Sequence, residues 1–90
     1  MGFEWDPAKA RSNLRKHQVS FEEAASALSD PMATTGDDPD HSAGEFRYVT
    51  FGVSRRGRLL VVSHTDRGDT IRIINARLAN KGERGIYEEG

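Results

Sequence analysis

The sequence contains no cysteine, only three prolines and no long apolar run. The lack of cysteine excludes a disulfide scaffold, a thiolate zinc site and catalysis by a thiol. No apolar segment approaches the ~18 residues that span a bilayer, and residues 1–20 lack the apolar core of a signal peptide. We therefore expect a cytoplasmic protein with no membrane segment.

The chain is also short. Its 90 residues predict one domain over residues 1–90. A domain of this length buries only about 60–65% of the surface of its unfolded chain, so its core must be thin. Hydrophobic residues make up 36% of the chain and charged residues 30%, which indicates a polar but folded protein.

The net charge of −1 hides a segregation of charge along the chain. Residues 31–45 carry four acids and no Lys or Arg, whereas residues 46–84 carry nine bases and three acids, a net charge of +6. Arginine outnumbers lysine by ten to three, and its guanidinium suits forked contacts with phosphate or carboxylate. This asymmetry favours a nucleic-acid partner, although arginines that only solvate exposed strand positions would give the same count.

Two helix starts are marked near the N-terminus. Asp6-Pro7 predicts a helix over residues 7–16, because Asp accepts from free backbone N–H groups and proline fits the first turn. Ser20 and Glu23 form a capping box that predicts a second helix, which ends at Asp30-Pro31. The apolar residues of this second helix recur at helical spacing and predict one buried face: Phe21, Ala24, Ala25 and Leu28.

The rest of the chain predicts a loop, three strands and a final helix. Residues 32–45 are rich in turn formers and acids and indicate a mobile loop. Asn75 is placed to cap a last helix over residues 76–87. Three apolar segments separated by short glycine-containing turns predict an antiparallel meander over residues 46–54, 58–65 and 70–76.

Together these elements predict an α+β fold. We expect a small antiparallel sheet of three to four strands, with two N-terminal helices and a C-terminal helix packed against one face. The fourth strand would come from residues 3–5, which otherwise serve as a hydrophobic anchor.

Residues along nearly the whole chain outside 32–45 match the pattern of a known family. Near the N-terminus these are Phe3-Glu4-Trp5-Asp6-Pro7, Lys9, Asn13, Lys16-His17 and Val19-Ser20-Phe21-Glu22-Glu23-Ala24. In the rest of the chain they are Asp30-Pro31, Arg47, Gly52, Leu60-Val61-Val62, His64-Thr65, Arg72-Ile73-Ile74, Ala76-Arg77, Glu83-Arg84 and Tyr87-Glu88. Because these residues occur together and in this order, the chain resembles the BrnT family of prokaryotic toxins from type II toxin–antitoxin systems.

The resemblance implies a RelE-like fold and an endoribonuclease that arrests translation. It also implies a BrnA-like antitoxin that neutralises the toxin and carries a ribbon-helix-helix part, so that the toxin meets DNA only through its partner. This chain has Asn75 where members usually have serine and Asn80 where they commonly have threonine, and its Gly82 and Gly85 are unusual for the last helix. Asn75 keeps a hydrogen-bonding side chain but supplies no hydroxyl.

Cleavage of RNA without a metal needs a base for the 2′-OH, cations for the phosphate and an acid for the leaving 5′-oxygen. The three histidines lie too far apart in the sequence to suggest a metal site, and we expect neither a metal nor a cofactor. The candidate catalytic residues are His64, Arg72, Arg77, Glu83 and Arg84.

Each of these candidates also has a purely structural interpretation. His64 is either a general acid or base, or a satisfied histidine on a half-buried strand. Arg77 and Arg84, two turns apart on the predicted last helix, clamp a phosphate in one interpretation and form ion pairs with neighbouring acids in the other. Glu83 is either a general base or a solvated helical residue.

A second group of residues are candidates for RNA binding: Lys16, His17, Arg47, Arg55, Arg56 and Arg58. Lys16 and His17 also suit the negative pole of the first helix, and the arginines at 55–58 also suit a solvated hairpin turn. We expect His41, in the acidic loop, to be solvated. Three aromatic residues are candidates for either base stacking or core packing: Phe3, Trp5 and Tyr48.

Three classes of function remain open. The first is an RNA-cleaving toxin neutralised by an antitoxin. The second is a catalytically weak or inactive toxin-like scaffold that binds an antitoxin for operon repression. The third is a nucleic-acid-binding protein without a partner, which the net charge of −1 disfavours because phosphate affinity scales with the cations presented.

Overall fold

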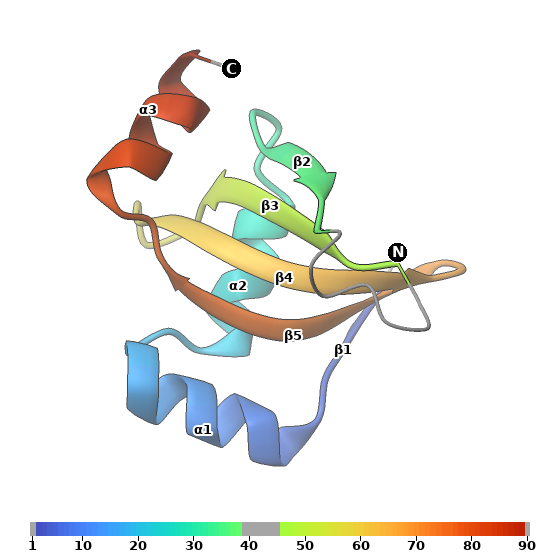
Figure 1. Ribbon diagram of the computed structural model, residues 1–90. Helices are drawn as coiled ribbons and strands as arrows, with labels where there is room; N and C mark the ends of the chain where they lie inside the picture. The colour runs from blue at the N-terminus through green and yellow to red at the C-terminus, as the bar shows by residue number, and fades with distance from the viewer. Residues whose placement is uncertain (1, 39–45, 90) are drawn as a thin grey trace.

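A computed structural model describes residues 2–38 and 46–89 of the chain. The described part is an α+β fold with three helices and a five-stranded mixed sheet (Figure 1). In chain order the elements are β1 (Gly2–Glu4), α1 (Pro7–His17), α2 (Phe21–Leu28), β2 (Thr34–Asp37), β3 (Tyr48–Val53), β4 (Leu59–Arg67), β5 (Thr70–Leu78) and α3 (Lys81–Glu89).

The sheet has the strand order β1-β5-β4-β3-β2. β1 pairs parallel to β5, with Phe3 opposite Ile71, and all other pairs are antiparallel. The prediction of a purely antiparallel sheet of three to four strands is therefore wrong. The parallel pair joins segments at opposite ends of the sequence, so no local pattern could indicate it.

β2 lies within the segment that was predicted to be a loop. Thr34 pairs with Phe51 and Asp37 with Tyr48, so the exposed edge of β3 recruits this polar segment into the sheet. Strand formation here follows from the available partner and overrides the turn-forming composition. His41 and the remainder of the acidic stretch, residues 39–45, lie outside the described residues.

The predicted meander is confirmed for β3, β4 and β5. Gly57 and Gly68 occupy the turns with φ of 78° and 63°, a conformation that glycine adopts without steric penalty. β5 extends further than predicted, to Leu78, which pairs with Leu60.

The longer β5 displaces the last helix. Asn75 lies inside the strand opposite Ser63, so it caps no helix, and α3 begins only at Lys81. The cap is Asn80: its Oδ1 accepts from the Glu83 N–H at 2.9 Å, and Glu83 Oε1 accepts from the Asn80 N–H at 2.9 Å. This reciprocal capping box fixes the start of α3 after the strand pairing has ended.

Both predicted N-cap side chains accept from the backbone of their helices, but the predicted capping box is only half formed, because the Glu23 carboxylate accepts from Ser54 and Arg58 instead of the Ser20 N–H. Asp6 Oδ1 accepts from the Ala8 N–H at 2.9 Å, and Ser20 Oγ accepts from the Glu23 N–H at 3.0 Å. Between the two helices, Gln18 takes a left-handed conformation with φ of 61° and closes α1 by donating its N–H to the Leu14 carbonyl.

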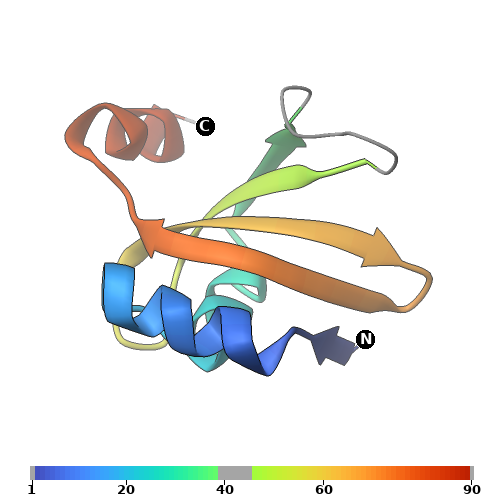
Figure 2. The ribbon, with the colours of Figure 1, turned by 60° about the horizontal axis from the view of Figure 1, so that its bottom comes forward.

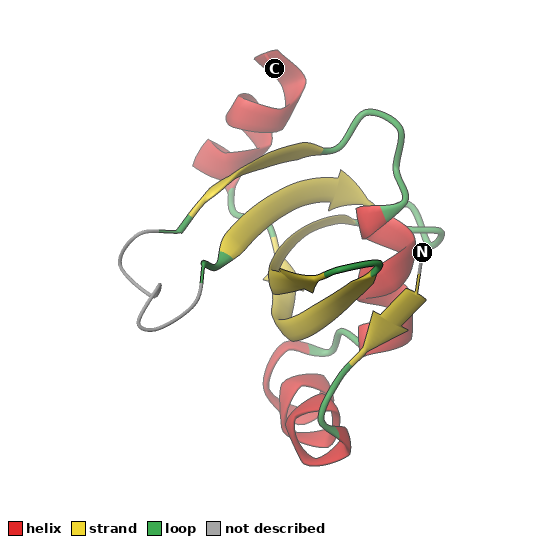
Figure 3. Cartoon of the chain, turned by 90° about the vertical axis from the view of Figure 1, so that its right-hand side faces the viewer, coloured by secondary structure: helices red, strands yellow, loops and turns green. Residues whose placement is uncertain are grey.

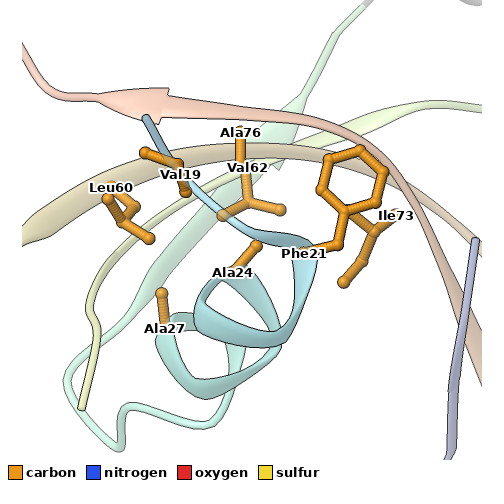
Figure 4. Packing of buried hydrophobic residues seen from close by; sticks show 8 residues of the cluster. All are labelled: Val19, Phe21, Ala24, Ala27, Leu60, Val62, Ile73 and Ala76. Carbon is orange, nitrogen blue, oxygen red and sulfur yellow. The ribbon is translucent and has the colours of Figure 1, made fainter. Parts of the chain in front are cut away.

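The core lies between α2 and the sheet, and α1 and α2 cover the same face (Figure 2). Eight buried residues form it (Figure 4): Val19, Phe21, Ala24, Ala27, Leu60, Val62, Ile73 and Ala76. Trp5 and Phe3 pack against this cluster, and the Trp5 ring meets Phe21 edge-on at 5.9 Å, so both residues serve the core. Figure 3 shows that α3 projects from the other side of the twisted sheet, away from α1.

A close approach between α2 and β3 at Gly52 yields a prediction about stability. A Cβ on Gly52 would lie 2.3 Å from the carbonyl oxygen of Ala27, so Gly52→Ala must push the helix off the strand. We expect a loss of about 2–3 kcal/mol in the free energy of unfolding, measured by urea denaturation. Gly36→Ala in β2 is the matched control, because a Cβ there meets nothing within 4 Å. Equal effects of the two substitutions would contradict the packing described.

Candidate functional site

A depression of about 440 Å³ lies between α1 and the second half of β5. Its lining combines residues of the helix with residues of the strand: Lys9, Ser12, Asn13, Lys16, His17, Ile74, Asn75 and Arg77. We refer to this surface as the α1–β5 depression. It brings together Lys16 and His17, predicted to bind RNA, and Arg77, predicted to be catalytic.

Asn13 holds the two walls of the depression together. Its Nδ2 donates to the Ala76 carbonyl at 2.8 Å and to the Val19 carbonyl at 3.0 Å, while its Oδ1 accepts from the Ala76 N–H at 3.1 Å. β1 pairs only with residues 70–72 of β5, so Asn13 satisfies the strand edge beyond the point where β1 ends. No sequence pattern predicted this role for Asn13. The one local indication is that a polar residue occupies an inward-facing position of the helix.

The helical repeat places further polar residues beside Asn13. Lys9, Ser12 and Lys16 are spaced by three or four residues and share the face of α1 that borders β5. His17 follows as the last residue of the helix. Asn13 therefore fixes the helix in an orientation that directs its cations toward the strand.

On β5, a bulge decides where Arg77 points. Ser63 pairs with Asn75 whereas His64 pairs with Ile73, which leaves Ile74 as an extra residue in β5. Side chains alternate along a strand, and the extra residue shifts that alternation. Ile73 and Ala76 consequently both face the core, and Arg77 is directed out of it.

Arg77 is held by an acid of α3. Its Nη1 and Nη2 donate to the two carboxylate oxygens of Glu83, each at 2.7 Å. This forked pair raises the pKa of Arg77 and lowers the pKa of Glu83, which also accepts from the Asn80 N–H. A carboxylate stabilised in this way is a poor proton acceptor, so the geometry gives Glu83 the role of positioning Arg77 and disfavours that of a base.

The cations of α1 that line the depression differ from Arg77 in their exposure and ion pairing. In the part of the chain that the structure describes, the side chains of Lys9, Lys16 and His17 are exposed and form no ion pair. With Arg77 they give the α1–β5 depression an excess of positive charge, balanced only by Glu83. Such a surface suits a phosphate group.

His64 lies apart from this surface. Its side chain is 5% exposed, on the core-facing side of β4, and stacks against the Tyr48 ring at 5.8 Å. Nε2 lies 2.8 Å from Thr50 Oγ1 and Nδ1 lies 3.2 Å from Asp66 Oδ1. Burial lowers the pKa of His64, and the Asp66 carboxylate opposes this effect. The geometry thus fits the interpretation of His64 as a satisfied histidine.

The remaining predicted arginines are distributed over other parts of the fold. Arg72 donates to Glu4 at 2.7 Å and ties β5 to β1. Arg58 is bound to Glu23, whose side chain is only 2% exposed, and also donates to the Gln18 carbonyl at 2.9 Å. Both arginines thus have structural partners. The hydrogen bonds with Arg58 lower the pKa of Glu23.

Four further arginines lie near the β3–β4 hairpin, on α3 or beside β3. Arg55 and Arg56 are exposed at the turn, with Arg56 Nη1 3.7 Å from Glu23. Arg84 lies on α3 and faces the hairpin, so the expectation that it shares a helical face with Arg77 is wrong. The carbonyl of Arg47 accepts from the Asp38 N–H at 2.9 Å, beside β3. None of these arginines lines the α1–β5 depression.

Across residues 2–38 and 46–89, no helix is long and apolar enough to cross a membrane. Within the same residues, no three or more His, Cys, Asp or Glu side chains gather in a way that would hold a metal ion.

Comparison with known proteins identifies the family of the chain. The family model described as "Ribonuclease toxin, BrnT, of type II toxin-antitoxin system" matches residues 5–83, which include every residue that lines the α1–β5 depression. The chain belongs to this family. BrnT proteins are described as ribonuclease toxins, so the family implies RNA as the substrate and an antitoxin as the partner.

The fold agrees with a solved structure. The crystal structure of the Brucella abortus ribonuclease toxin BrnT matches with a TM-score of 0.70 at 21% sequence identity, over 90% of this chain and 99% of that chain. At this identity the likeness shows the shared α+β fold. A search of curated proteins finds no match to the chain.

The buried His64 predicts how stability depends on pH. Its pKa lies below the ordinary value of 6.5, so the unfolded chain takes up this proton more readily than the native chain. Stability is therefore full above about pH 6.5 and falls as the pH drops below it. We expect urea denaturation to show this fall between about pH 7 and pH 5, and His64→Gln to remove most of the slope.

Two hydrogen-bonded carboxylates contribute to stability at lower pH than His64 does. The pKa values of Glu23 and Asp30 lie below their ordinary values of 4.5 and 3.8, so their contributions are lost only in more acidic solution. His17→Gln, which removes an exposed imidazole, is the control and should keep the slope. A slope that disappears in His17→Gln but persists in His64→Gln would show the assignment to be wrong.

Proposed function

We propose that this BrnT protein is a metal-independent endoribonuclease that inhibits translation, and that the scissile phosphate of the RNA binds in the α1–β5 depression. The observation that carries the proposal is the meeting of Lys9, Lys16, His17 and Arg77 on one surface, where only Glu83 opposes their charge. An RNA phosphate supplies the missing negative charge.

The surface offers the groups that RNA cleavage requires. The 2′-oxygen attacks the adjacent phosphorus, the bond from phosphorus to the 5′-oxygen breaks, and the proton lost from the 2′-OH is matched by one gained at the leaving oxygen. His17 supplies the imidazole of the depression, a side chain that can both accept and donate a proton. Lys9, Lys16 and Arg77 stabilise the charge that develops on the phosphate. The need for a 2′-OH restricts the substrate to RNA.

We also propose the partner and the place of action. A BrnA-like antitoxin with a ribbon-helix-helix part would neutralise the toxin in the cytoplasm and link it to operator DNA. The family description supports an antitoxin as the partner. That this antitoxin is BrnA-like and carries a ribbon-helix-helix part is our proposal.

One observation favours a second function, a toxin-like scaffold with little or no catalysis. Asn75 lies exposed on the wall of the α1–β5 depression, next to the strand position of Ala76. The resemblance to the family puts serine at this position, and the amide cannot replace a hydroxyl in proton transfer. If the hydroxyl is required, Asn75→Ser should create activity that the natural chain lacks.

The proposal predicts which substitutions reduce cleavage of RNA in EDTA. Lys16 and His17 are exposed and unpaired among the described residues, so changing them should leave the fold intact. We expect His17→Gln to lower the cleavage rate by about 10²-fold. We expect Lys16→Ala to weaken binding and to reduce the dependence of log K on log salt by about one unit. The readouts are gel assays of a labelled RNA and fluorescence anisotropy at several salt concentrations.

Arg15→Ala is the matched control, because Arg15 is an exposed cation on α1 that does not line the depression. It should behave like the natural chain in both assays. Equal losses in Arg15→Ala and Lys16→Ala would reduce the proposal to a general effect of charge. Absence of cleavage by the folded natural chain, together with activity in Asn75→Ser, would support the scaffold.

A further inference from the structure

A second hollow lies between α3 and the β3–β4 hairpin. It has a volume of about 360 Å³ and is lined by Val53, Gly57, Arg58, Leu59, Leu78, Arg84, Tyr87 and Glu88. We refer to it as the α3 groove. None of the functional residues of the α1–β5 depression lines it.

The floor of the α3 groove is apolar and incompletely covered. Val53, Leu59 and Leu78 contribute to it from the ends of three strands. The side of Leu78 is open to solvent, with 46% of the residue exposed, and Ile86 on α3 is 52% exposed. Exposed aliphatic side chains in and beside a hollow favour contact with another molecule.

α3 itself is weakly attached. None of its residues is buried, and two side-chain contacts near its ends tether it: Glu83 to Arg77, and the Tyr87 hydroxyl, which donates to Asp30 at 2.7 Å. A nine-residue helix with two glycines is marginal on its own. An occupant of the groove would supply the packing that α3 lacks.

The rim of the groove carries Arg84 and Glu88, and exposed arginines of the hairpin adjoin it. Arg84 forms no ion pair among the described residues, although Glu88 lies one turn further along α3. Arg55 and Arg56 are exposed at the adjoining hairpin turn, and Arg58 is already engaged by Glu23. The occupant should therefore present carboxylates beside its apolar side chains.

From these observations we propose that an amphipathic, acidic segment of the antitoxin docks in the α3 groove, with an apolar side chain against Leu59 and Leu78 and a carboxylate facing Arg84. The inference rests on the proposed function only for the existence of an antitoxin. An amphipathic helix binds in this way: its apolar residues enter a groove, and its charged residues face the charged rims.

The floor favours a protein over RNA. Single-stranded RNA is bound by stacking of bases on exposed aromatic rings along a basic track. Tyr87 is the one aromatic side chain that lines the α3 groove, and its hydroxyl is bonded to Asp30. The aliphatic floor of Val53, Leu59 and Leu78 offers hydrophobic burial and no stacking platform.

The test measures the affinity of the full-length protein for the full-length antitoxin encoded in the same operon, by isothermal titration calorimetry. Leu78→Glu places a charge on the groove floor, and Arg84→Glu reverses the charge of the rim. We expect each to weaken binding at least about tenfold. The matched controls lie on α1: Leu14→Glu, because Leu14 is 49% exposed, and Arg15→Glu. Both should stay within about twofold of the natural chain.

Several outcomes would overturn the inference. One is unchanged affinity in both groove variants, and another is a loss confined to the α1 controls, which would place the antitoxin on α1. A dimer of the natural chain that Leu78→Glu converts to monomer in sedimentation would make the groove a contact between two copies. Weaker binding of a non-cleavable 2′-O-methyl RNA by Arg84→Glu, with unchanged antitoxin affinity, would make it an RNA surface.

The fold of each variant is checked by circular dichroism and thermal denaturation. Arg84 is exposed, so Arg84→Glu still decides the question if Leu78→Glu fails to fold. Cleavage of RNA by the natural chain is measured in parallel. If the natural chain cuts no RNA but the groove variants lose the antitoxin, the ribonuclease proposal fails and the docking site stands. If it cuts RNA and the groove variants bind normally, only the docking site fails.

Discussion

The hydrogen bonds between Asn13 and the backbone of Ala76 are the interaction on which the candidate site depends. β1 covers only the first three residues of the β5 edge, and a single amide side chain then satisfies both backbone groups of Ala76. The amide thus acts as a one-residue continuation of the sheet. It fixes α1 beside β5, and the lysines of the helix and Arg77 of the strand consequently line one depression.

The distribution of ion pairs then determines which cations are available for a ligand. Arg58, Arg72 and Arg77 each bind an acid from a distant or neighbouring element, and the first of these acids, Glu23, is buried. Three of the nine bases of residues 46–84 are therefore engaged in holding the fold. The unpaired cations of the site come from α1, which carries four bases and no acid but lies within residues 1–30, where five acids offset those four bases. Charge along the sequence was thus a poor guide to charge on the surface.

Features with local causes were predictable from the sequence. The caps at Asp6 and Ser20, the glycine turns at 57 and 68 and the meander all depend on neighbouring residues. The parallel β1, the edge strand β2 and the register bulge at Ile74 depend on partners far along the chain. The family resemblance predicted the class of protein, but the meeting of Lys16 with Arg77 follows only from the contact of α1 with β5. Asn75 was the predicted cap of the last helix, and the pairing of β5 with β4 moved the start of that helix to Asn80.

We propose that RNA binds where α1 meets the end of β5. The most direct test is a titration of the ¹⁵N-labelled protein with a short 2′-O-methyl RNA, which cannot be cut, followed through the backbone amide resonances. The structure predicts that the changing resonances belong to residues 9–17 and 74–77. Changes confined to the hairpin residues 55–58 or to the surroundings of His64, with α1 unaffected, would contradict it.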